Sequence, residues 1–278
     1  MTTRPALRVV LVNYQCADHI EARLRSGVLE PLDEVLIVDN ASDPERVRSW
    51  ESRYGARTLL LPQNVGFAAA VNAAVQASRT RAPILLLNPD LELTEPTLQA
   101  LLAALAAPGA DGNCPDGVAP LLTDAGGAVQ VGAAGGPLTV GAVATYFLFV
   151  SHLLPRLRGV FLTRRQLQAG LQADWLCMAC LLLEPDAFDR FGPVPEDELV
   201  YGEDLAWGTA ATLAGARFRL LPDVRAWHAR GVSGGSARWI GAFERTVRRR
   251  MPGLGGAVAV VAVQVGLTAR RAVGRRVV

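Results

Sequence analysis

The chain has 278 residues, of which 50% are hydrophobic and 19% are charged, so it can bury a sizeable core as one large domain or two modest ones. This composition excludes a disordered chain, a collagen and a small disulfide-stapled scaffold. All 28 basic residues are arginine. Because the chain has no lysine, it cannot carry a phosphate-loop lysine, a Schiff base or a lysine general base.

The net charge of +2 hides two regions of opposite sign. Residues 241–278 contain eight arginines and one acidic residue, Glu244, whereas residues 1–240 contain 20 basic and 25 acidic residues. A basic terminus favours an anionic surface, and its apolar residues favour lipid headgroups over nucleic acid. A solvated basic terminus is the alternative. We expect a peripheral contact with an anionic membrane surface and no nucleic-acid partner.

Four cysteines lie at irregular spacing, and the chain begins without a basic segment that leads into a long apolar run. Both features indicate a reduced, cytoplasmic protein. Cys177 and Cys180 form a C-x-x-C motif inside the apolar run 175–183, and no second cysteine pair completes a zinc site. A buried strand is therefore favoured over a redox or metal role.

Short apolar runs alternate with segments of helical period over the first ninety residues. This pattern predicts β-α-β units with strands at residues 7–12, 35–38, 59–61 and 84–87. Asp18 and Thr94 are the expected N-caps of two helices. The sequence thus predicts an α/β fold with a single Rossmann-like, mostly parallel central sheet flanked by helices.

The later segments are less regular. Residues 108–137 are rich in glycine and other small residues, which predicts a loose connection. Residues 138–155 and 251–269 carry no formal charge, but glycines interrupt both, and a spanning helix needs about 20 apolar residues. We expect packed or interfacial helices, the second being a monotopic anchor flanked by arginines.

Polar side chains follow each of the predicted strands. They are Asn13 and Tyr14, Asp39 and Asn40, Asn64, and Asn88 and Asp90. Because the carboxyl ends of parallel strands meet at one edge of a sheet, this edge is the expected ligand crevice. There Asp39 suits a ribose or a base edge, although a turn-capping role is equally consistent.

Two positions at this edge suit phosphate chemistry. Gly66 opens an alanine-rich helix, and the N–H groups at such a start can bind a phosphate. The chain has no G-x-G-x-x-G motif, so the dinucleotide fingerprint is missing. Asp90 can hold a divalent cation that also binds substrate phosphates, and a turn-forming role is its alternative.

A second group of polar residues lies between residues 196 and 236. It includes Glu203 and Asp204 at the predicted start of a helix, His228 after a strand, and a glycine- and serine-rich segment at 231–236. The helix dipole favours ionised carboxylates at that start, where capping is the alternative role. His228 is either a buried core histidine or a metal ligand beside Asp90.

Taken together, these motifs resemble glycosyltransferase family 2, with the bacterial rhamnosyltransferase-like enzymes as the closest branch. Over residues 7–236 they occur in the family's order: Asn13-Tyr14, Asp39-Asn40-Ala41-Ser42, Asn64-Val65-Gly66-Phe67 through Asn72, Asn88-Pro89-Asp90, Asp174-Trp175, Tyr201-Gly202-Glu203-Asp204 and His228. The resemblance implies a GT-A domain at 1–240, with a nucleotide-sugar-binding half (1–92) and an acceptor-binding half (93–240). A basic, apolar tail follows at 241–278.

The resemblance also implies a role for each motif. Asp39 would contact the nucleoside of a nucleotide-diphospho-sugar, in a pocket formed by Asn13, Tyr14, Asn40, Asn64, Gly66, Phe67, Asn72 and Asn88. Asp90 and His228 would hold Mg²⁺ or Mn²⁺. Asp204, beside Glu203, would take the proton of the acceptor hydroxyl in an inverting displacement. The implied donor is dTDP-rhamnose, and the implied acceptor is a cell-envelope glycan or a lipid-linked sugar.

Some positions depart from the family pattern. Leu205, Ala206 and Ala210 stand where a second carboxylate and an arginine usually follow the Glu-Asp pair, and Met178 replaces a common glycine. A catalytically weak nucleotide-sugar-binding subunit of a glycan assembly complex is therefore the alternative function. A sugar-phosphate nucleotidyltransferase is less favoured, because residues 13–16 are unlike a glycine-rich phosphate loop.

Overall fold

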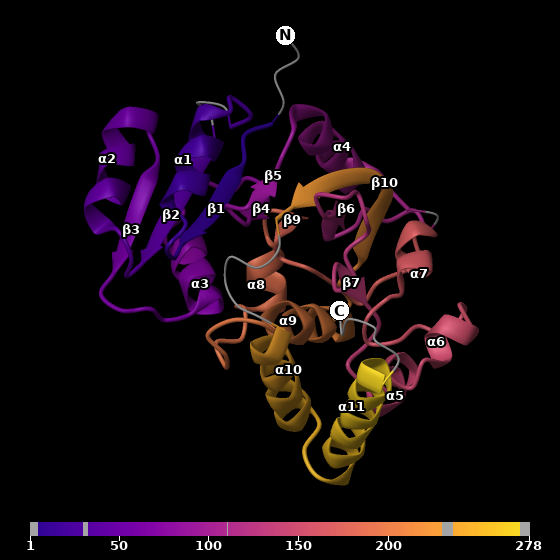
Figure 1. Cartoon of the computed structure of the whole chain (residues 1–278). Helices are drawn as coiled ribbons and strands as arrows, with labels where there is room; N and C mark the ends of the chain where they lie inside the picture. Colours follow the sequence, from indigo (N-terminus) through magenta and orange to yellow (C-terminus); the bar gives the residue numbers. More distant parts are fainter. Residues whose placement is uncertain (1–4, 30–32, 110, 230–235, 273–278) are drawn as a thin grey trace.

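The computed structural model describes residues 5–29, 33–109, 111–229 and 236–272. Within them one sheet contains, in spatial order, β3 (Arg57–Leu61), β2 (Glu34–Asn40), β1 (Arg8–Asn13), β4 (Ile84–Leu87), β9 (Cys180–Leu183), β6 (Gly117–Thr123), β10 (Phe218–His228) and β5 (Leu91–Glu92) (Figure 1). A separate pair is formed by β7 (Ala134–Gly135) and β8 (Trp175–Leu176).

Parallel pairing dominates the sheet, and two strands reverse its direction. β3, β2, β1 and β4 run parallel, whereas β9 is antiparallel to β4 and β6, and β5 is antiparallel to β10. β1, β2 and β4 are rich in Val, Leu and Ile and buried along almost their whole length, as expected for strands covered on both faces. Their register sets Asn13 opposite Asp39, so the predicted polar residues share one edge.

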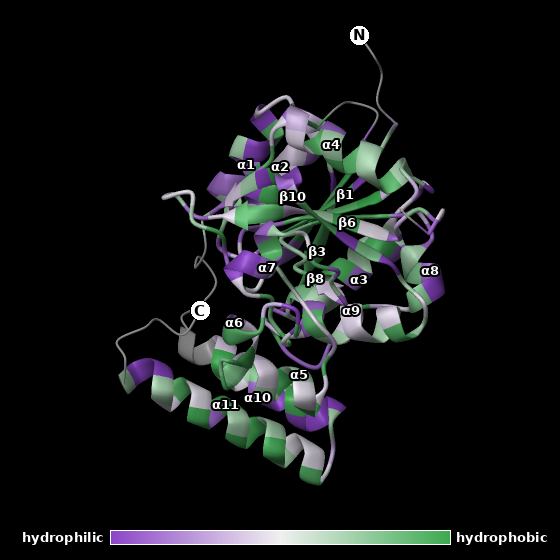
Figure 2. Cartoon of the chain, turned by 90° about the vertical axis from the view of Figure 1, so that its right-hand side faces the viewer, coloured by the Kyte–Doolittle hydropathy of each residue, from purple (hydrophilic) through white to green (hydrophobic). Residues whose placement is uncertain are grey.

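Seven helices accompany the large sheet: α1 (Ala17–Arg25), α2 (Pro44–Tyr54), α3 (Phe67–Ala77), α4 (Glu95–Ala106), α7 (Arg164–Gln168), α8 (Ala187–Phe191) and α9 (Glu203–Leu213). The other described helices are α5 (Val140–Phe147), α6 (Val150–Leu153), α10 (Ser236–Arg250) and α11 (Leu254–Ala272). Figures 1 and 2 show α5, α10 and α11 gathered at the lower end of the molecule, below the sheet.

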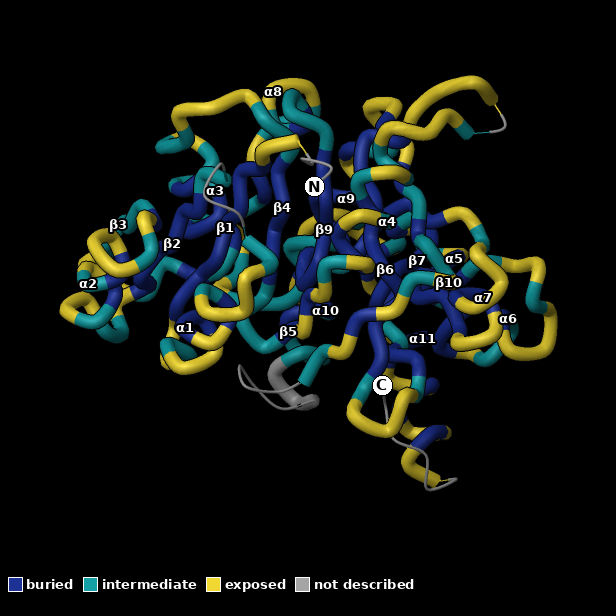
Figure 3. Tube along the Cα trace, turned by 90° about the horizontal axis from the view of Figure 1, so that it is seen from above, coloured by how far each residue is buried: buried dark blue, intermediate teal, exposed yellow. Residues whose placement is uncertain are grey.

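The interior contains two hydrophobic clusters. The larger one fills the space between the sheet and its helices, where Figure 3 shows the strands as mostly buried. The smaller one joins α5, α10 and α11 to Trp175 of β8 and Leu205 of α9. Because α10 begins at Ser236 and contributes Phe243 to this cluster, the helices near the C-terminus pack directly against the elements that hold Asp204.

The α/β fold with a mostly parallel central sheet is confirmed, and so is the Thr94 cap, whose side chain accepts from the Thr97 N–H. The Asp18 cap is wrong. Cys16 occupies the N-cap of α1, and Asp18 lies in the first turn, where it pairs with Arg46. The dipole of α1 favours an acidic residue in this first turn as much as at a cap.

The prediction of a loose connection at 108–137 is also wrong. This stretch contains β6, whose seven residues are all buried in the middle of the sheet. Small residues are needed there, because a Cβ on Gly117 would lie 2.8 Å from a Leu183 methyl group. The apolar run 175–183 forms two strands, β8 and β9, instead of one, and residues 138–155 form α5 and α6. No helix among the described residues combines the length and apolarity needed to cross a bilayer.

Gly208 sets the distance between α9 and β8, so replacing it should destabilise the protein. A Cβ at this position would lie 2.4 Å from Trp175 Cβ, and we expect Gly208→Ala to lower the free energy of unfolding by about 1–3 kcal/mol. Gly141→Ala, in α5, is the control, because its Cβ would meet nothing within 4 Å and should add about 0.5–1 kcal/mol. Urea unfolding checks both values, and equal stability of the two variants would contradict this account.

Candidate active site

The carboxyl ends of β1 and β2 meet in a hydrogen-bonded cluster around Asp39. Its Oδ1 atom accepts hydrogen bonds from Asn13 Nδ2 (2.8 Å), Ser42 Oγ (2.8 Å) and the Asp43 N–H (3.1 Å). Asn13 and Asp39 are buried, and neighbouring Tyr14 is 43% exposed. The Asp39 carboxylate therefore organises the turn after β2 and is itself held rigidly at the edge of the sheet.

A second cluster of amides joins the end of β2 to the start of α3. Asn40 Nδ2 donates to Asn64 Oδ1 (2.8 Å), and Asn40 Oδ1 accepts from the Val65 N–H (2.9 Å). Asn64 Oδ1 also accepts from the Gly66 N–H (3.0 Å). These bonds fix the first turn of α3 beside the strand that holds Asp39.

A segment from the second half of the chain covers the start of α3. It runs from residue 192 to residue 202, and we call it the α8–α9 segment. The Phe67 N–H donates to Leu199 O (2.9 Å), and a Cβ on Gly66, where φ is +91°, would lie 2.8 Å from Leu199 Cα. Gly66 is therefore required for this close approach. The Phe67 N–H is engaged by the protein here, although the sequence suggested that it could bind a phosphate.

Asn72 holds the same segment one and a half turns further along α3. Its Nδ2 donates to Val194 O (2.8 Å) and Glu196 Oε1 (2.8 Å), and its Oδ1 accepts from the Val194 N–H (2.9 Å). In this structure Asn72 thus joins the two halves of the chain. Its predicted place in a nucleoside pocket stays a prediction.

Ion pairs attach the α8–α9 segment to α10 on its other side. Arg245 makes a bidentate pair with Glu198, at 2.9 Å from Nε to Oε1 and 2.7 Å from a terminal nitrogen to Oε2. Arg249 lies 3.3 Å from Glu198, and Arg250 lies 2.8 Å from Asp197. The segment that leads into Glu203 is therefore held between α3 and α10.

Strand pairing brings Asp90 and His228 together. β5 pairs with the end of β10, so His228 lies opposite Leu91, and the Ala229 N–H donates to Asp90 O (3.1 Å). His228 Nε2 lies 3.3 Å from Asp90 Oδ1 and 3.5 Å from Asn88 Nδ2. Burial alone would raise the pKa of Asp90, but the hydrogen bond and charge of His228 outweigh it and hold that pKa below its ordinary value.

Gln130 fixes the orientation of the His228 ring. Its Oε1 lies 3.0 Å from His228 Nδ1, and its Nε2 donates to His228 O (2.7 Å). An amide oxygen can only accept, so Nδ1 carries a proton and Nε2 faces Asp90. When the ring is neutral, the lone pair of Nε2 faces the Asp90 carboxylate, and the two repel each other unless a cation lies between them. This arrangement fits a divalent cation.

The donor set also suggests how such a cation would be bound. No third His, Cys, Asp or Glu joins Asp90 and His228 in the part of the chain that the structure describes. One carboxylate and one imidazole suit Mn²⁺ or Mg²⁺ that completes its coordination with water and diphosphate oxygens. The residues present therefore fit a metal shared with a phosphorylated substrate.

The Cys16 thiol is influenced by the carboxylates of both Asp39 and Asp90. Burial raises its pKa, and the negative charges of Asp90 and Asp39 raise it further. The strands that precede Asn13, Asp39 and Asn88 run parallel, so these polar residues share one edge of the sheet.

The carboxylates at the start of α9 lie in an apolar environment. Asp204 Oδ1 accepts from the Leu205 N–H (2.8 Å), and its carboxyl group is hydrogen-bonded to the Cys177 thiol. Glu203 Oε2 is buried and has no hydrogen-bond partner among the described residues. Burial, with the charge of Asp204 adding to it, raises the pKa of Glu203 to about 8, and burial raises that of Asp204 to about 6. Burial therefore disfavours ionisation of both carboxyl groups at once, and the two titrate as a pair.

A cavity of about 40 Å³ adjoins Asp204. It is lined, besides Asp204, by Gly132, Phe161, Trp175, Gly202, Leu205, Trp239 and Phe243. The rings of Trp239 and Phe243 stack with centroids 5.7 Å apart and an interplanar angle of 8°. Since both belong to α10, a helix from the predicted tail region forms part of the wall beside the candidate base.

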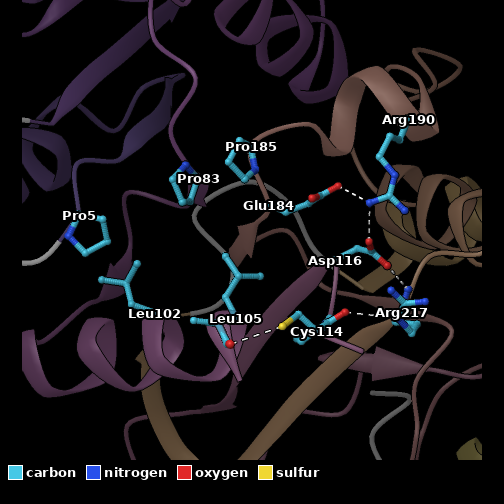
Figure 4. A pocket seen from close by; sticks show the side chains of 12 residues that line it. Pro5, Pro83, Leu102, Leu105, Cys114, Asp116, Glu184, Pro185, Arg190 and Arg217 are labelled. Carbon is cyan, nitrogen blue, oxygen red and sulfur yellow. Dashed lines mark hydrogen bonds and ion pairs between the residues drawn. The ribbon is translucent and has the colours of Figure 1, made fainter. Parts of the chain in front are cut away.

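A larger cavity lies at the opposite edge of the sheet. It has a volume of about 390 Å³, and Figure 4 shows Pro83, Asp116, Glu184 and Arg190 among its lining residues. These residues precede β4 and β6 or follow the antiparallel β9, so the cavity is at the amino ends of the parallel strands. It contains none of the predicted site residues.

Sequence reasoning missed several residues of this region. Gln130 lies in the stretch interpreted as a loose connection, and Cys177 was assigned to the core together with Cys180. Of the two thiols, Cys180 is indeed fully buried in β9, and Met178 is also buried. No motif indicated Gln130, and the only signal for Cys177 was its place two residues after the Asp174-Trp175 motif. The predicted glycine- and serine-rich contribution at 231–235 lies outside the described residues.

Comparison with known proteins agrees with the motif pattern. Residues 8–122 match the family model described as "Glycosyl transferase family 2", a stretch that spans β1 to β6 and includes Asp39, Asn64 and Asp90. No curated protein sequence matches the chain.

Solved structures share the whole fold at low sequence identity. The mannosyltransferase PcManGT from Pyrobaculum calidifontis, in complex with GDP-Man and Mn²⁺, is 17% identical, with a TM-score of 0.62 over 98% of this chain and 76% of that one. S. aureus TarS 1-349 in complex with UDP-GlcNAc is 15% identical, with a TM-score of 0.57 over 96% and 73%. GalNAc-T7 with UDP, GalNAc and Mn²⁺ is 12% identical, with a TM-score of 0.56 over 89% of this chain and 48% of that one. The chain therefore has the GT-A fold that the sequence predicted.

Gln130 should act as a positioning residue for a bound metal. Gln130→Leu leaves His228 Nδ1 without its acceptor, so we expect about 10- to 100-fold weaker Mn²⁺ binding in the presence of a nucleoside diphosphate. Gln130→Glu keeps an acceptor there and should lose less affinity. Calorimetric titration with Mn²⁺ measures both. Equal affinities of the wild type and the leucine variant would remove Gln130 from this role.

The raised pKa of Glu203 predicts how stability depends on pH. The folded chain keeps this proton to about pH 8, whereas the unfolded chain releases it near the ordinary value of 4.5, so the wild type loses stability as the pH rises between these values. Glu203→Gln removes this loss and should be more stable than the wild type at pH 9, by at most about 5 kcal/mol, but not at pH 4. Urea unfolding at both pH values tests this, with Glu45→Gln on the exposed surface of α2 as the control. A pH-independent difference would contradict it.

Proposed function

We propose that the chain is a glycosyltransferase that moves a sugar from a nucleotide-diphospho-sugar to a hydroxyl group of an acceptor. The observation that carries this proposal is the juxtaposition of Asp90 and His228 at the carboxyl edge of a sheet whose residues 8–122 match a family 2 model. Asp39 lies at the same edge, where it would contact the nucleoside.

Asp204 is the residue that we assign to proton transfer. Its carboxylate would take the proton of the acceptor hydroxyl while that oxygen attacks the anomeric carbon and the bond to the diphosphate breaks. A positioned base of this kind contributes about 10²- to 10⁴-fold to the rate. Because one base and one displacement suffice, the proposed reaction inverts the anomeric configuration.

The raised pKa of Glu203 supports the assignment of Asp204 as the base. It stays protonated near neutral pH, so it does not add a second negative charge beside Asp204. The largely apolar surroundings that raise both pKa values also limit the contact of the proposed base with water.

Charge on the departing diphosphate requires a positive partner. A divalent cation held by Asp90 and His228 would supply this charge without a proton transfer. Asp90 would contribute a carboxylate oxygen, and His228 a ring nitrogen oriented by Gln130. The absence of lysine from the chain leaves arginine as the alternative source of permanent positive charge.

The identity of the sugar and of the acceptor are further proposals. The motif pattern favours dTDP-rhamnose and a cell-envelope glycan or lipid-linked acceptor, whereas the similar structures contain GDP-Man and UDP-GlcNAc. A lipid-linked acceptor would place the protein at the cytoplasmic face of the membrane as a peripheral protein. Thermal shift with these three donors, with and without Mn²⁺, distinguishes them, because stabilisation follows occupancy.

Replacing the base should abolish transfer without abolishing donor binding. In Asp204→Asn we expect turnover of the preferred donor to fall by about 10²-fold or more, with donor affinity unchanged within about twofold. Asp223→Asn, an exposed carboxylate on β10, is the control and should retain full turnover. Release of nucleoside diphosphate in the presence of Mn²⁺ is the readout. Equal turnover of Asp204→Asn and the wild type would remove Asp204 as the base.

The same assay tests a second candidate function, a catalytically weak nucleotide-sugar-binding subunit. Ala206 favours it, since this residue is buried in α9 at the place where the family usually has a carboxylate. Donor binding by the wild type without turnover on any acceptor would support the binding subunit and contradict the transferase.

A further inference from the structure

One face of α11 carries a row of exposed apolar side chains. Leu254 is 82% exposed, Val258 48%, Val261 62% and Val265 53%. Their spacing of four, three and four residues places them on the same side of an α-helix. An exposed leucine is ordinary on a protein surface, but a continuous row along a helix indicates a surface that is covered in use.

The opposite face of α11 is fixed in the protein. Val260, Val263 and Leu267 are buried in the cluster that includes Phe147 of α5. A Cβ on Gly266 would lie 2.2 Å from Phe147 O, so the two helices are in close contact. α11 therefore cannot rotate to bury its exposed row, which stays available for contact with another surface.

Positive charge flanks the exposed row at both ends. At the end of α10, Arg248 is exposed just before the turn into α11, whereas Arg249 and Arg250 are paired with Glu198 and Asp197. Arg271 is exposed in the last turn of α11. Residues 251–272 contain no acidic residue. Figure 2 shows α11 as the outermost helix at the lower edge of the molecule, with hydrophobic colour over most of its length.

We propose that the exposed face of α11 docks onto an anionic lipid surface. The apolar row would enter the boundary between headgroups and acyl chains, and Arg248 and Arg271 at its two ends would contact lipid phosphates. The helix would lie in the plane of the surface, because both ends of the row carry charge. This contact concerns where the protein binds, so its failure would leave the proposed transfer reaction untouched.

Charge favours a lipid surface over a second copy of the chain. If two copies paired through this face about a two-fold axis, the arginines at the start of one α11 would lie near Arg271 of the other or near their own counterparts. Either arrangement brings like charges together. Anionic headgroups present the complementary charge at both ends.

The test uses the full chain and vesicles of phosphatidylcholine with or without phosphatidylglycerol. We expect the wild type to co-sediment with the anionic vesicles and the double variant Val258→Ser, Val261→Ser to bind about tenfold or more weakly. Leu213→Ser is the matched control, since Leu213 is 83% exposed at the end of α9, and it should bind as the wild type does. Unchanged binding of the double variant would overturn the proposal.

A second variant tests the charges separately. Arg248→Gln with Arg271→Gln should weaken binding to the anionic vesicles by about fivefold for each arginine lost and have little effect with phosphatidylcholine alone. Thermal unfolding of every variant checks that the fold is intact. Size-exclusion chromatography with light scattering provides the remaining outcome: a dimer of the wild type that the valine substitutions dissociate would assign the face to a second copy and overturn the lipid proposal.

Discussion

The pairing of β5 with the end of β10 is the constraint on which the candidate site depends. β5 has only two residues, yet its ladder with β10 sets His228 opposite Leu91 and next to Asp90. Asp90 and His228 are separated by about half of the chain, and no local propensity could bring them together. Because the pairing is made by backbone hydrogen bonds, the separation of the two side chains is fixed by the sheet.

The sequence predicted β1, β2 and β4 well, because each of these strands has its own apolar run. β1, β2 and β4 are parallel, buried on both faces and end in polar residues, so their apolar runs and carboxyl ends are readable one strand at a time. The position of Asp39 beside Asn13 followed directly from this reading. The role of each side chain there did not, because the same hydrogen bonds serve a turn and a ligand pocket equally well.

The rest of the site could not be predicted from local patterns. β9 runs against its neighbours, so its amino end reaches the edge where the parallel strands end, and Cys177 comes close to Asp204. Gln130 lies in a segment of small residues with no period. Asn72 belongs to a recognisable motif, but its partner, Val194, lies far along the chain. In each case a contact distant in sequence determines the position.

The α8–α9 segment joins the start of α3 to the start of α9, a connection that local sequence patterns did not indicate. It contacts α3 through Leu199, α10 through Glu198 and Asp197, and then continues into the helix that carries Asp204. Its main chain fits against Gly66, where no larger residue could stand. The predicted nucleotide-binding half and the candidate base are therefore joined by one short stretch of backbone.

The tether between this segment and α10 includes the exposed Arg250–Asp197 pair, which responds to ionic strength more than the Arg245–Glu198 pair, because the Glu198 side chain is only 10% exposed. The Debye length falls from about 10 Å in 0.1 M salt to about 3 Å in 1 M salt, which weakens exposed pairs far more than buried ones. Added salt would therefore weaken the Arg250–Asp197 contact that helps to hold the segment leading into α9. Properties of this protein that depend on the position of α9 should for this reason be compared at one salt concentration.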